Sequence, residues 1–292
     1  MVRLRFARNA GRLAPSMWNR VPLILRAVLA AAVVTGSATV VWGALVQLNL
    51  KLSPPLPWAT VVMAAFLFFY WRFLKGWGWP RSTAAGRRSS LRAESISSSA
   101  WRWSLLAGGL GLSASIALFI VAHRLIQWPQ PAHADLSHIP STTLLPLLLM
   151  SALVAGISEE AGFRGYMQAP LERRYGAAVA IAVTSVVFGL AHLTHGAFAP
   201  AILFDIGWGA LYGLIAYLSG SIVPAIVLHS SADALEFIAA WRFRPAAPAP
   251  LVWVNGPDPL FCTDWLLVVL LAGASILAFR RLAGARPRTQ VR

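Results

Sequence analysis

Residues 142–161 read TTLLPLLLMSALVAGISEEA, an apolar run that ends in two adjacent glutamates, Glu159 and Glu160. A run of this length matches a helix that crosses the hydrocarbon core of a bilayer. A carboxylate in that environment costs several kcal/mol unless it is paired or hydrated. The stretch therefore predicts a transmembrane helix with a functional site near one end.

The composition of the whole chain agrees with a membrane protein. Of its 292 residues, 58% are hydrophobic and 12% are charged, whereas a soluble domain carries about 25% charged residues. Long apolar runs must cross the membrane as helices, because lipid offers no hydrogen-bond partners and a helix satisfies its own backbone N–H and C=O groups. The sequence predicts an all-α polytopic membrane protein. Its single cysteine, Cys262, excludes an internal disulfide.

Apolar runs of roughly spanning length occur eight times along the chain. They lie at about residues 27–48, 57–73, 103–122, 142–161, 177–194, 199–218, 222–241 and 260–279. We therefore expect about eight transmembrane helices in a single domain, residues 27–279. A basic N-terminus, residues 1–26, precedes this domain, and a basic tail, residues 280–292, follows it.

The positive charges support a topology with both termini in the cytoplasm. Of the 25 Lys and Arg residues, 18 lie in three tracts, residues 3–26, 72–102 and 280–292, which flank apolar runs. With eight spans, all three tracts fall on the same side, together with the short segments 162–176 and 219–221. This distribution is the positive-inside pattern. The Arg- and Ala-rich composition and the lack of an organellar signal favour a bacterial inner membrane.

The net charge of +15 raises the question of an anionic partner. A nucleic-acid binder is expected to carry a basic surface interleaved with aromatic residues, and no such surface is visible, so we expect no nucleic-acid partner. Basic tracts beside apolar runs also suit the headgroups of anionic lipids. The bilayer, including anionic lipids at these loops, is the expected partner.

The first polar block is Glu159-Glu160-x-x-x-Arg164. Glu160 and Arg164 have the i, i+4 spacing of an ion pair on one helix face. Neighbouring residues on a helix point about 100° apart, so this pair leaves Glu159 facing elsewhere, available as a general base. The alternative is an ion-paired helix end at the membrane surface.

Two further blocks follow, Phe188-x-x-x-His192 and His229-x-x-x-Asp233. Each pair shares a helix face. Phe188 most simply packs, and His192 alone is equally typical of a structural histidine. In the third block, a carboxylate beside an imidazole fixes its tautomer and orientation, which suits either a structural pair or a site.

A hairpin of helices four and five brings the first two blocks together. If the chain turns at about Tyr175–Gly176, Glu159 and His192 are similarly distant from the turn along the chain and lie side by side. Gly162, Gly165 and Pro170 make a break in the intervening stretch plausible. We therefore expect a site between helices 4, 5 and 7.

In this order and spacing, the three blocks resemble the motif set of the CPBP family. This family comprises the CAAX-processing type II proteases, or intramembrane glutamic endopeptidases, and the bacteriocin-processing and immunity proteins. Its pattern is Glu-Glu-x-x-x-Arg, then Phe-x-x-x-His, then His-x-x-x-Asn or Asp. The resemblance covers about residues 142–241, which are the expected protease core.

The resemblance implies an endopeptidase acting on a membrane-associated protein or peptide. Glu159 and His192 would activate a water, and His229 and Asp233 would face the oxyanion. Glu160 and Arg164 would support them, with Phe188 packing nearby. Asn is the commonest family residue at the last position, and Asp233 donates a hydrogen bond only if protonated. Its role is therefore either that of a donor or that of an orienter of His229.

Two alternatives remain beside a metal-independent enzyme without a cofactor. Glu159, His192 and His229 would suit a zinc site, although no His-Glu-x-x-His pair exists and the ligands come from three helices. Intramembrane Glu, His and Asp residues also serve proton relays, so a transporter, a membrane scaffold or an immunity protein is the non-catalytic alternative.

Overall fold

The computed structural model describes residues 20–129, 136–243 and 250–285, and every regular element within these ranges is a helix. The predicted all-α fold is confirmed. The outer parts of the two basic termini, residues 1–19 and 286–292, lie outside the described residues. The helices are α2 (Leu23–Leu52), α3 (Trp58–Leu74), η1 (Arg81–Thr83), α4 (Ala84–Leu91), α5 (Ser98–Leu125), α6 (Ser141–Glu159), η2 (Glu160–Gln168), α7 (Ala169–Tyr175), α8 (Ala177–Ala191), η3 (His192–His195), α9 (Ala199–Ser219), α10 (Val223–Arg242), α11 (Val252–Asn255) and α12 (Pro259–Gly284).

The membrane-spanning character of the chain is also confirmed, although the helices differ in length. Within the described ranges, six helices are long and apolar enough to cross a membrane: α2, α5, the continuous helix Ser141–Tyr175, α9, α10 and α12. Two more apolar helices, α3 with 17 residues and α8 with 15, coincide with the second and fifth predicted spans. Each predicted run thus contains a helix, but two of these helices are shorter than the other six.

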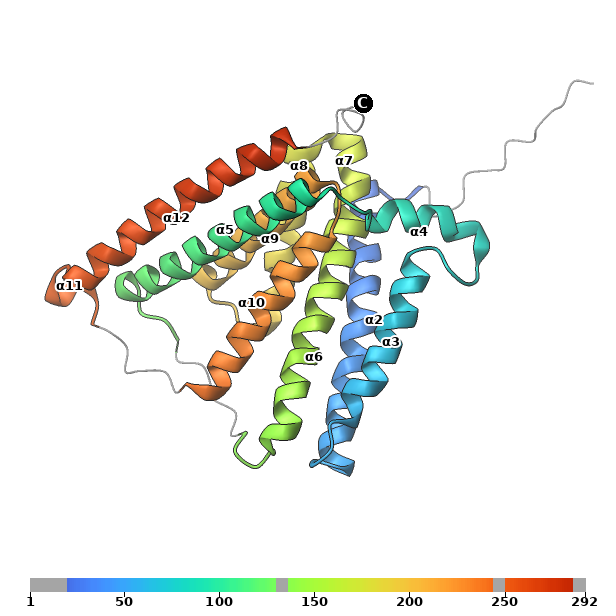
Figure 1. Cartoon of the computed structure of the whole chain (residues 1–292), viewed down its shortest axis with the longest axis horizontal. Coiled ribbons are helices and arrows are strands. Elements are labelled where there is room, and N and C mark those ends of the chain that lie inside the picture. Colours follow the sequence, from blue (N-terminus) through green and yellow to red (C-terminus); the bar gives the residue numbers. More distant parts are fainter. Residues whose placement is uncertain (1–19, 130–135, 244–249, 286–292) are drawn as a thin grey trace, which may run out of the picture.

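Figure 1 shows how the helices alternate in direction. The helix α4, the turn between α7 and α8 and the C-terminal end of α12 lie at one end of the bundle. The connection between α2 and α3 and the start of α6 lie at the opposite end. The first of these ends gathers segments that the charge rule assigns to the cytoplasm.

The fourth span differs from the prediction in one respect. The span was expected to end near Ala161, with an inside segment at 162–176 and a break within it, but the helix that begins at Ser141 continues without interruption to Tyr175, with a nine-residue π-helix, η2, in its middle. The turn into α8 then occurs at Gly176, whose φ of 82° lies in the left-handed region that favours glycine. The predicted hairpin is therefore present, and the expected break within residues 162–176 is wrong.

Close packing explains why glycines in this segment do not break the helix. A Cβ on Gly162 would lie 2.3 Å from the hydroxyl oxygen of Thr35 on α2. A Cβ on Gly165 would lie 3.1 Å from the carbonyl oxygen of Ser90 on α4. The two glycines therefore let neighbouring elements approach the backbone of η2, as small residues do between membrane helices.

The basic tract before the third span also contains regular structure. Residues 74–102 include η1, α4 and the first turn of α5. Leu91, at the end of α4, is buried in an apolar cluster that includes Ala161 and Ile222. The helix α4 therefore packs against the bundle beside η2.

Small residues also set the spacing of the helices that carry the remaining polar blocks. A Cβ on Gly156 of α6 would lie 2.1 Å from the hydroxyl oxygen of Ser230 on α10. A Cβ on Gly189 of α8 would lie 2.5 Å from the side chain of Ile206 on α9. These contacts bring α10 to α6 and α9 to α8, so residues from four helices meet around η2.

Candidate active site

Glu160, the first residue of η2, is the most buried charged group of the site. Its side chain has no exposed surface. Its Oε1 accepts a hydrogen bond of 2.8 Å from Arg164 Nη1 and lies 2.8 Å from His229 Nδ1. A buried charge is tolerated when it is paired and hydrogen-bonded in this way. The i, i+4 pair that the sequence predicted is present.

Arg164 is enclosed by groups that suit a guanidinium. Its side chain is 1% exposed, and Nη2 donates to the carbonyl oxygen of Gly209 over 3.2 Å. Its Cζ lies 4.3 Å from the ring centroid of Phe188 and 5.3 Å from that of Tyr212. Aromatic faces attract a cation at such distances. The arginine is therefore fixed between α8 and α9 and presents its charge to Glu160.

His229, on α10, connects the buried pair to the other carboxylates. A carboxylate paired with Arg164 accepts, so the His229 Nδ1 carries the proton and donates it to Glu160. The other ring nitrogen, Nε2, lies 3.6 Å from Asp233 Oδ2 and 3.9 Å from Glu159 Oε2. Both distances exceed those of a direct hydrogen bond. The structure thus aims the Nε2 of His229 between two carboxylates.

Glu159 and Asp233 are more accessible than the pair beneath them. Each of these two side chains is 19% exposed. The Oε2 of Glu159 is itself buried and has no hydrogen-bond partner in the described part of the chain. Each glutamate has one buried oxygen, Oε2, without a hydrogen-bond partner among the described residues. The two environments differ because Oε1 of Glu160 is bonded to Arg164 and His229 within a fully buried side chain, whereas the side chain of Glu159 is partly accessible.

His192 lies at the end of α8, at the first residue of η3. Its Nδ1 is 2.8 Å from the carbonyl oxygen of Phe188. A carbonyl only accepts, so Nδ1 carries the proton, and in the neutral ring Nε2 is left as the acceptor. The ring of Phe188 lies 4.6 Å from that of His192 and 6.1 Å from that of His229. His192 and Asp233 also interact electrostatically.

One helix of this site was missing from the prediction. The site was expected between helices 4, 5 and 7, but α9 also contributes to it. Tyr212 of α9 is 3% exposed and stacks on His229, with ring centroids 4.8 Å apart and planes 11° from parallel. The motif Gly209-x-x-x-Gly213 was the available signal, because small residues at this spacing expose backbone carbonyls to a neighbouring helix.

Metal ligation was the alternative use of the same side chains. Over the described ranges, no three His, Cys, Asp or Glu residues form a group that could hold a metal ion. The hydrogen bond to Glu160 also occupies one of the two His229 nitrogens. Metal independence stays a prediction, which a chelator can test.

Comparison with known families agrees with the motifs. Residues 141–235 match the model of the family described as Type II CAAX prenyl endopeptidase Rce1-like. The matched region runs from the start of α6 to just beyond Asp233, and it contains every residue of the three blocks. The resemblance to the CAAX protease family is confirmed. No curated protein and no solved structure matches the chain.

Proposed function

We propose that this multi-pass membrane protein hydrolyses a peptide bond of a membrane-associated protein or peptide, with Glu159 as the general base. The family match supports an intramembrane endopeptidase. Glu159 suits the role of base because its Oε2 has no hydrogen-bond partner among the described residues, while its side chain remains partly accessible. A positioned base contributes typically about 10²- to 10⁴-fold to the rate.

In this proposal Glu159 and His192 hold the attacking water. When Nδ1 of His192 donates to the carbonyl oxygen of Phe188, Nε2 is the acceptor nitrogen of the neutral ring, and it orients one O–H of the water. Glu159 takes the proton from the other O–H, and the oxygen attacks the peptide carbonyl carbon. The proton then passes from Glu159 to the leaving amine as the C–N bond breaks, so the carboxylate is regenerated.

His229 stabilises the negative charge that develops on the carbonyl oxygen. With Nδ1 held by Glu160, an imidazolium donates from Nε2 into the space beside Glu159 and Asp233. A donor of this kind is worth about 3 kcal/mol in the transition state. Asp233 as a carboxylate would repel the oxyanion, so its role is to orient His229 and not to bind the oxyanion. Tyr212 restricts the ring of His229 by stacking on it.

One observation carries the proposal. Arg164 and His229 both donate to Oε1 of the buried Glu160, and these two bonds fix the ring of His229. The other ring nitrogen, Nε2, then faces the partly accessible carboxylates of Glu159 and Asp233. A purely structural ion pair needs no histidine whose second nitrogen faces two further carboxylates. We also propose that the enzyme needs no metal, and that it lies in a bacterial inner membrane with both termini in the cytoplasm.

Mass spectrometry of protein termini tests the function directly. Membrane and secreted proteins are compared between cells carrying the wild type, Glu159→Gln and the control Asp264→Asn at equal abundance. Asp264 lies on α12, away from the three blocks, and its change also converts a carboxylate to an amide. We expect new termini with the wild type and the control that are absent with Glu159→Gln. These termini also identify the substrate.

The same cells distinguish the alternatives. Identical termini in all three strains, with Glu159→Gln folded and still rescuing a physiological phenotype, would contradict the protease and favour a binding or immunity role. Once a substrate is known, cleavage by the purified enzyme is measured with a chelator. Unchanged cleavage is expected, whereas a loss restored by zinc would establish the metal-dependent mechanism instead.

A further inference from the structure

A second polar feature lies beside the site helix, at the end of the bundle that carries α4. It is a cavity of about 260 Å³ bounded by α4 and the segment after it, by α7 and by the turn that follows α9. One water occupies about 30 Å³ of liquid, so the cavity has room for a tetrahedral phosphate group with water around it. The catalytic proposal makes no use of this cavity.

Arginines dominate its lining. Arg88, Arg92 and Arg173 contribute three cations, against Glu94 and Glu172. Glu172 is already satisfied, because its Oε1 accepts from Arg92 Nη1 over 3.0 Å and from Gln168 Nε2 over 2.7 Å. In the part of the chain that the structure describes, the exposed guanidinium groups of Arg88 and Arg173 have no hydrogen-bond or ion-pair partner.

Hydrogen bonds hold the wall that carries Arg88 in place. Arg87, its buried neighbour, donates to the carbonyl oxygens of Phe73 over 2.8 Å and of Trp77 over 3.0 Å, which ties α4 to the end of α3. After α4, Arg92 adopts a left-handed φ of 57°, and its carbonyl oxygen accepts from Ile222 N over 3.0 Å. The arginine side chains therefore project from a fixed backbone, which reduces the entropy lost on binding.

A row of polar side chains on one helix face runs from the active site to this cavity. Glu160, Arg164, Gln168 and Glu172 follow one another at four-residue intervals along η2 and α7. Arg164 and Gln168 each donate to α9, to the carbonyl oxygens of Gly209 and Gly213. The acid that bounds the cavity thus belongs to the same hydrogen-bonded helix face as the acid that holds His229.

We propose that this basic cavity binds a phosphate-bearing group, either the headgroup of an anionic phospholipid or soluble phosphate. The inference goes beyond the peptidase function and does not depend on it. Arg88 and Arg173 supply charge-assisted hydrogen bonds to the phosphate oxygens, for which a guanidinium is geometrically suited. Arg92 remains paired with Glu172 and adds its charge. Clusters of this kind at a membrane surface recognise anionic headgroups.

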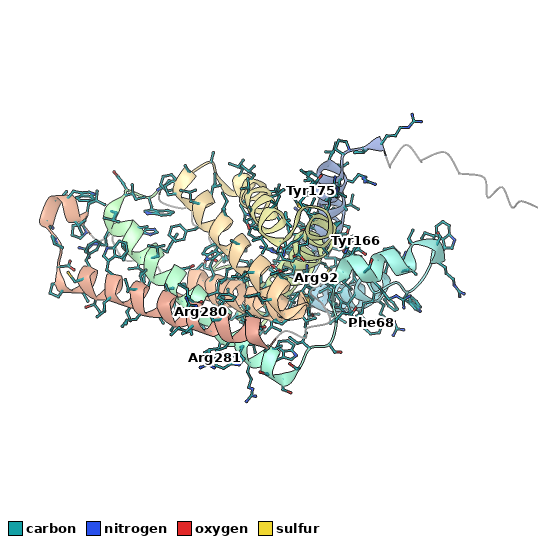
Figure 2. The ribbon with its side chains drawn as sticks, turned by 90° about the horizontal axis from the view of Figure 1, so that it is seen from above. Phe68, Arg92, Tyr166, Tyr175, Arg280 and Arg281 are labelled. Atoms are coloured by element: carbon teal, nitrogen blue, oxygen red, sulfur yellow. The ribbon has the colours of Figure 1, made fainter. Side chains whose placement is uncertain are left out.

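Native mass spectrometry of the full-length protein in detergent tests the site. Phosphatidylglycerol is titrated, with phosphatidylcholine as the neutral reference, against the wild type and Arg88→Gln/Arg173→Gln. The matched control is Arg280→Gln/Arg281→Gln, which removes two charges on α12, apart from Arg92 in Figure 2. We expect roughly tenfold weaker binding of phosphatidylglycerol to the cavity variant, the equivalent of one charge-assisted bond, and unchanged binding to the control.

A second variant shows whether weaker binding comes from the changed charge or from misfolding of the double arginine variant. Ser89→Glu adds a carboxylate at an exposed position that lines the cavity, and we expect it to weaken binding to a similar degree while the protein elutes as the wild type does in gel filtration. Displacement of the lipid by millimolar inorganic phosphate would identify soluble phosphate as the ligand, and retention of the lipid would identify the headgroup. Equal retention of lipid and of phosphate by all four proteins would overturn the proposal.

Discussion

Replacing Arg164 by methionine is expected to destabilise the protein more than any exposed charge change. The substitution keeps an unbranched side chain but leaves the carboxylate of Glu160, which has no exposed surface, without its cation. Breaking a buried pair by removing one partner typically costs about 3–5 kcal/mol. The hydrogen bond to Gly209 and the contact with the Phe188 ring are lost as well. We therefore expect a loss of about 4 kcal/mol in the free energy of unfolding.

The double variant Arg164→Met/Glu160→Gln separates the charge effect from lost packing. Glutamine retains an oxygen that accepts from Nδ1 of His229, and no uncompensated charge remains. We expect it to recover about 2 kcal/mol or more relative to Arg164→Met alone. Both are measured by reversible unfolding in mixed micelles. A single variant within about 1 kcal/mol of the wild type, or a double variant less stable than the single one, would refute the reasoning.

Two further predictions concern separate aspartates. Asp233→Asn should retain at least about a tenth of the cleavage rate, because the amide oxygen still faces Nε2 of His229, whereas Asp233→Ala should lose about 100-fold. Equal loss in both variants would argue that the carboxylate itself is required. Asp258 has its pKa lowered from the ordinary 3.8 by hydrogen bonds from Arg124 and the backbone N–H of Phe261. This interaction therefore stabilises the fold above pH 3.8, and the stabilisation is lost as pH falls through the lower, folded-state value. Asp258→Asn should have a lower Tm than the wild type near neutral pH, and the difference in Tm should disappear at acid pH. A difference in Tm that does not change with pH would point to a cause other than ionisation.

The features that the sequence predicted are those governed by local spacing or by apolar length. Each apolar run contains a helix, because lipid permits little else. Glu160 and Arg164 pair as expected, since four residues separate them on one face. The turn at Gly176 also follows from local conformation, because a positive φ there favours glycine.

The features that the sequence did not predict depend on neighbours distant in the chain. Nothing in residues 160–168 distinguishes a π-helix from a loop until Thr35 and Ser90 are seen against Gly162 and Gly165. Tyr212 belongs to the site because α9 packs on α8 and η2. The spacing Gly209-x-x-x-Gly213 indicates a close helix contact but does not say which helix makes it. Tertiary packing, rather than propensity, decides such positions.

The adjacent glutamates show how the fold turns a local pattern into two different chemical groups. Both stand in the same apolar helix, yet only Glu160 is hydrogen-bonded to Arg164 and to His229, because consecutive helical side chains diverge by about 100°. Glu159 lies 3.9 Å from the other nitrogen of His229. The junction of α6 and η2 falls between them, and π-helical turns inside α-helices frequently mark functional sites. The pairing of Glu160 with Arg164 does not involve Glu159. Glu159 lies beside this pair, partly accessible and with a buried oxygen that has no partner among the described residues, which suits the proposed role of base for water activation.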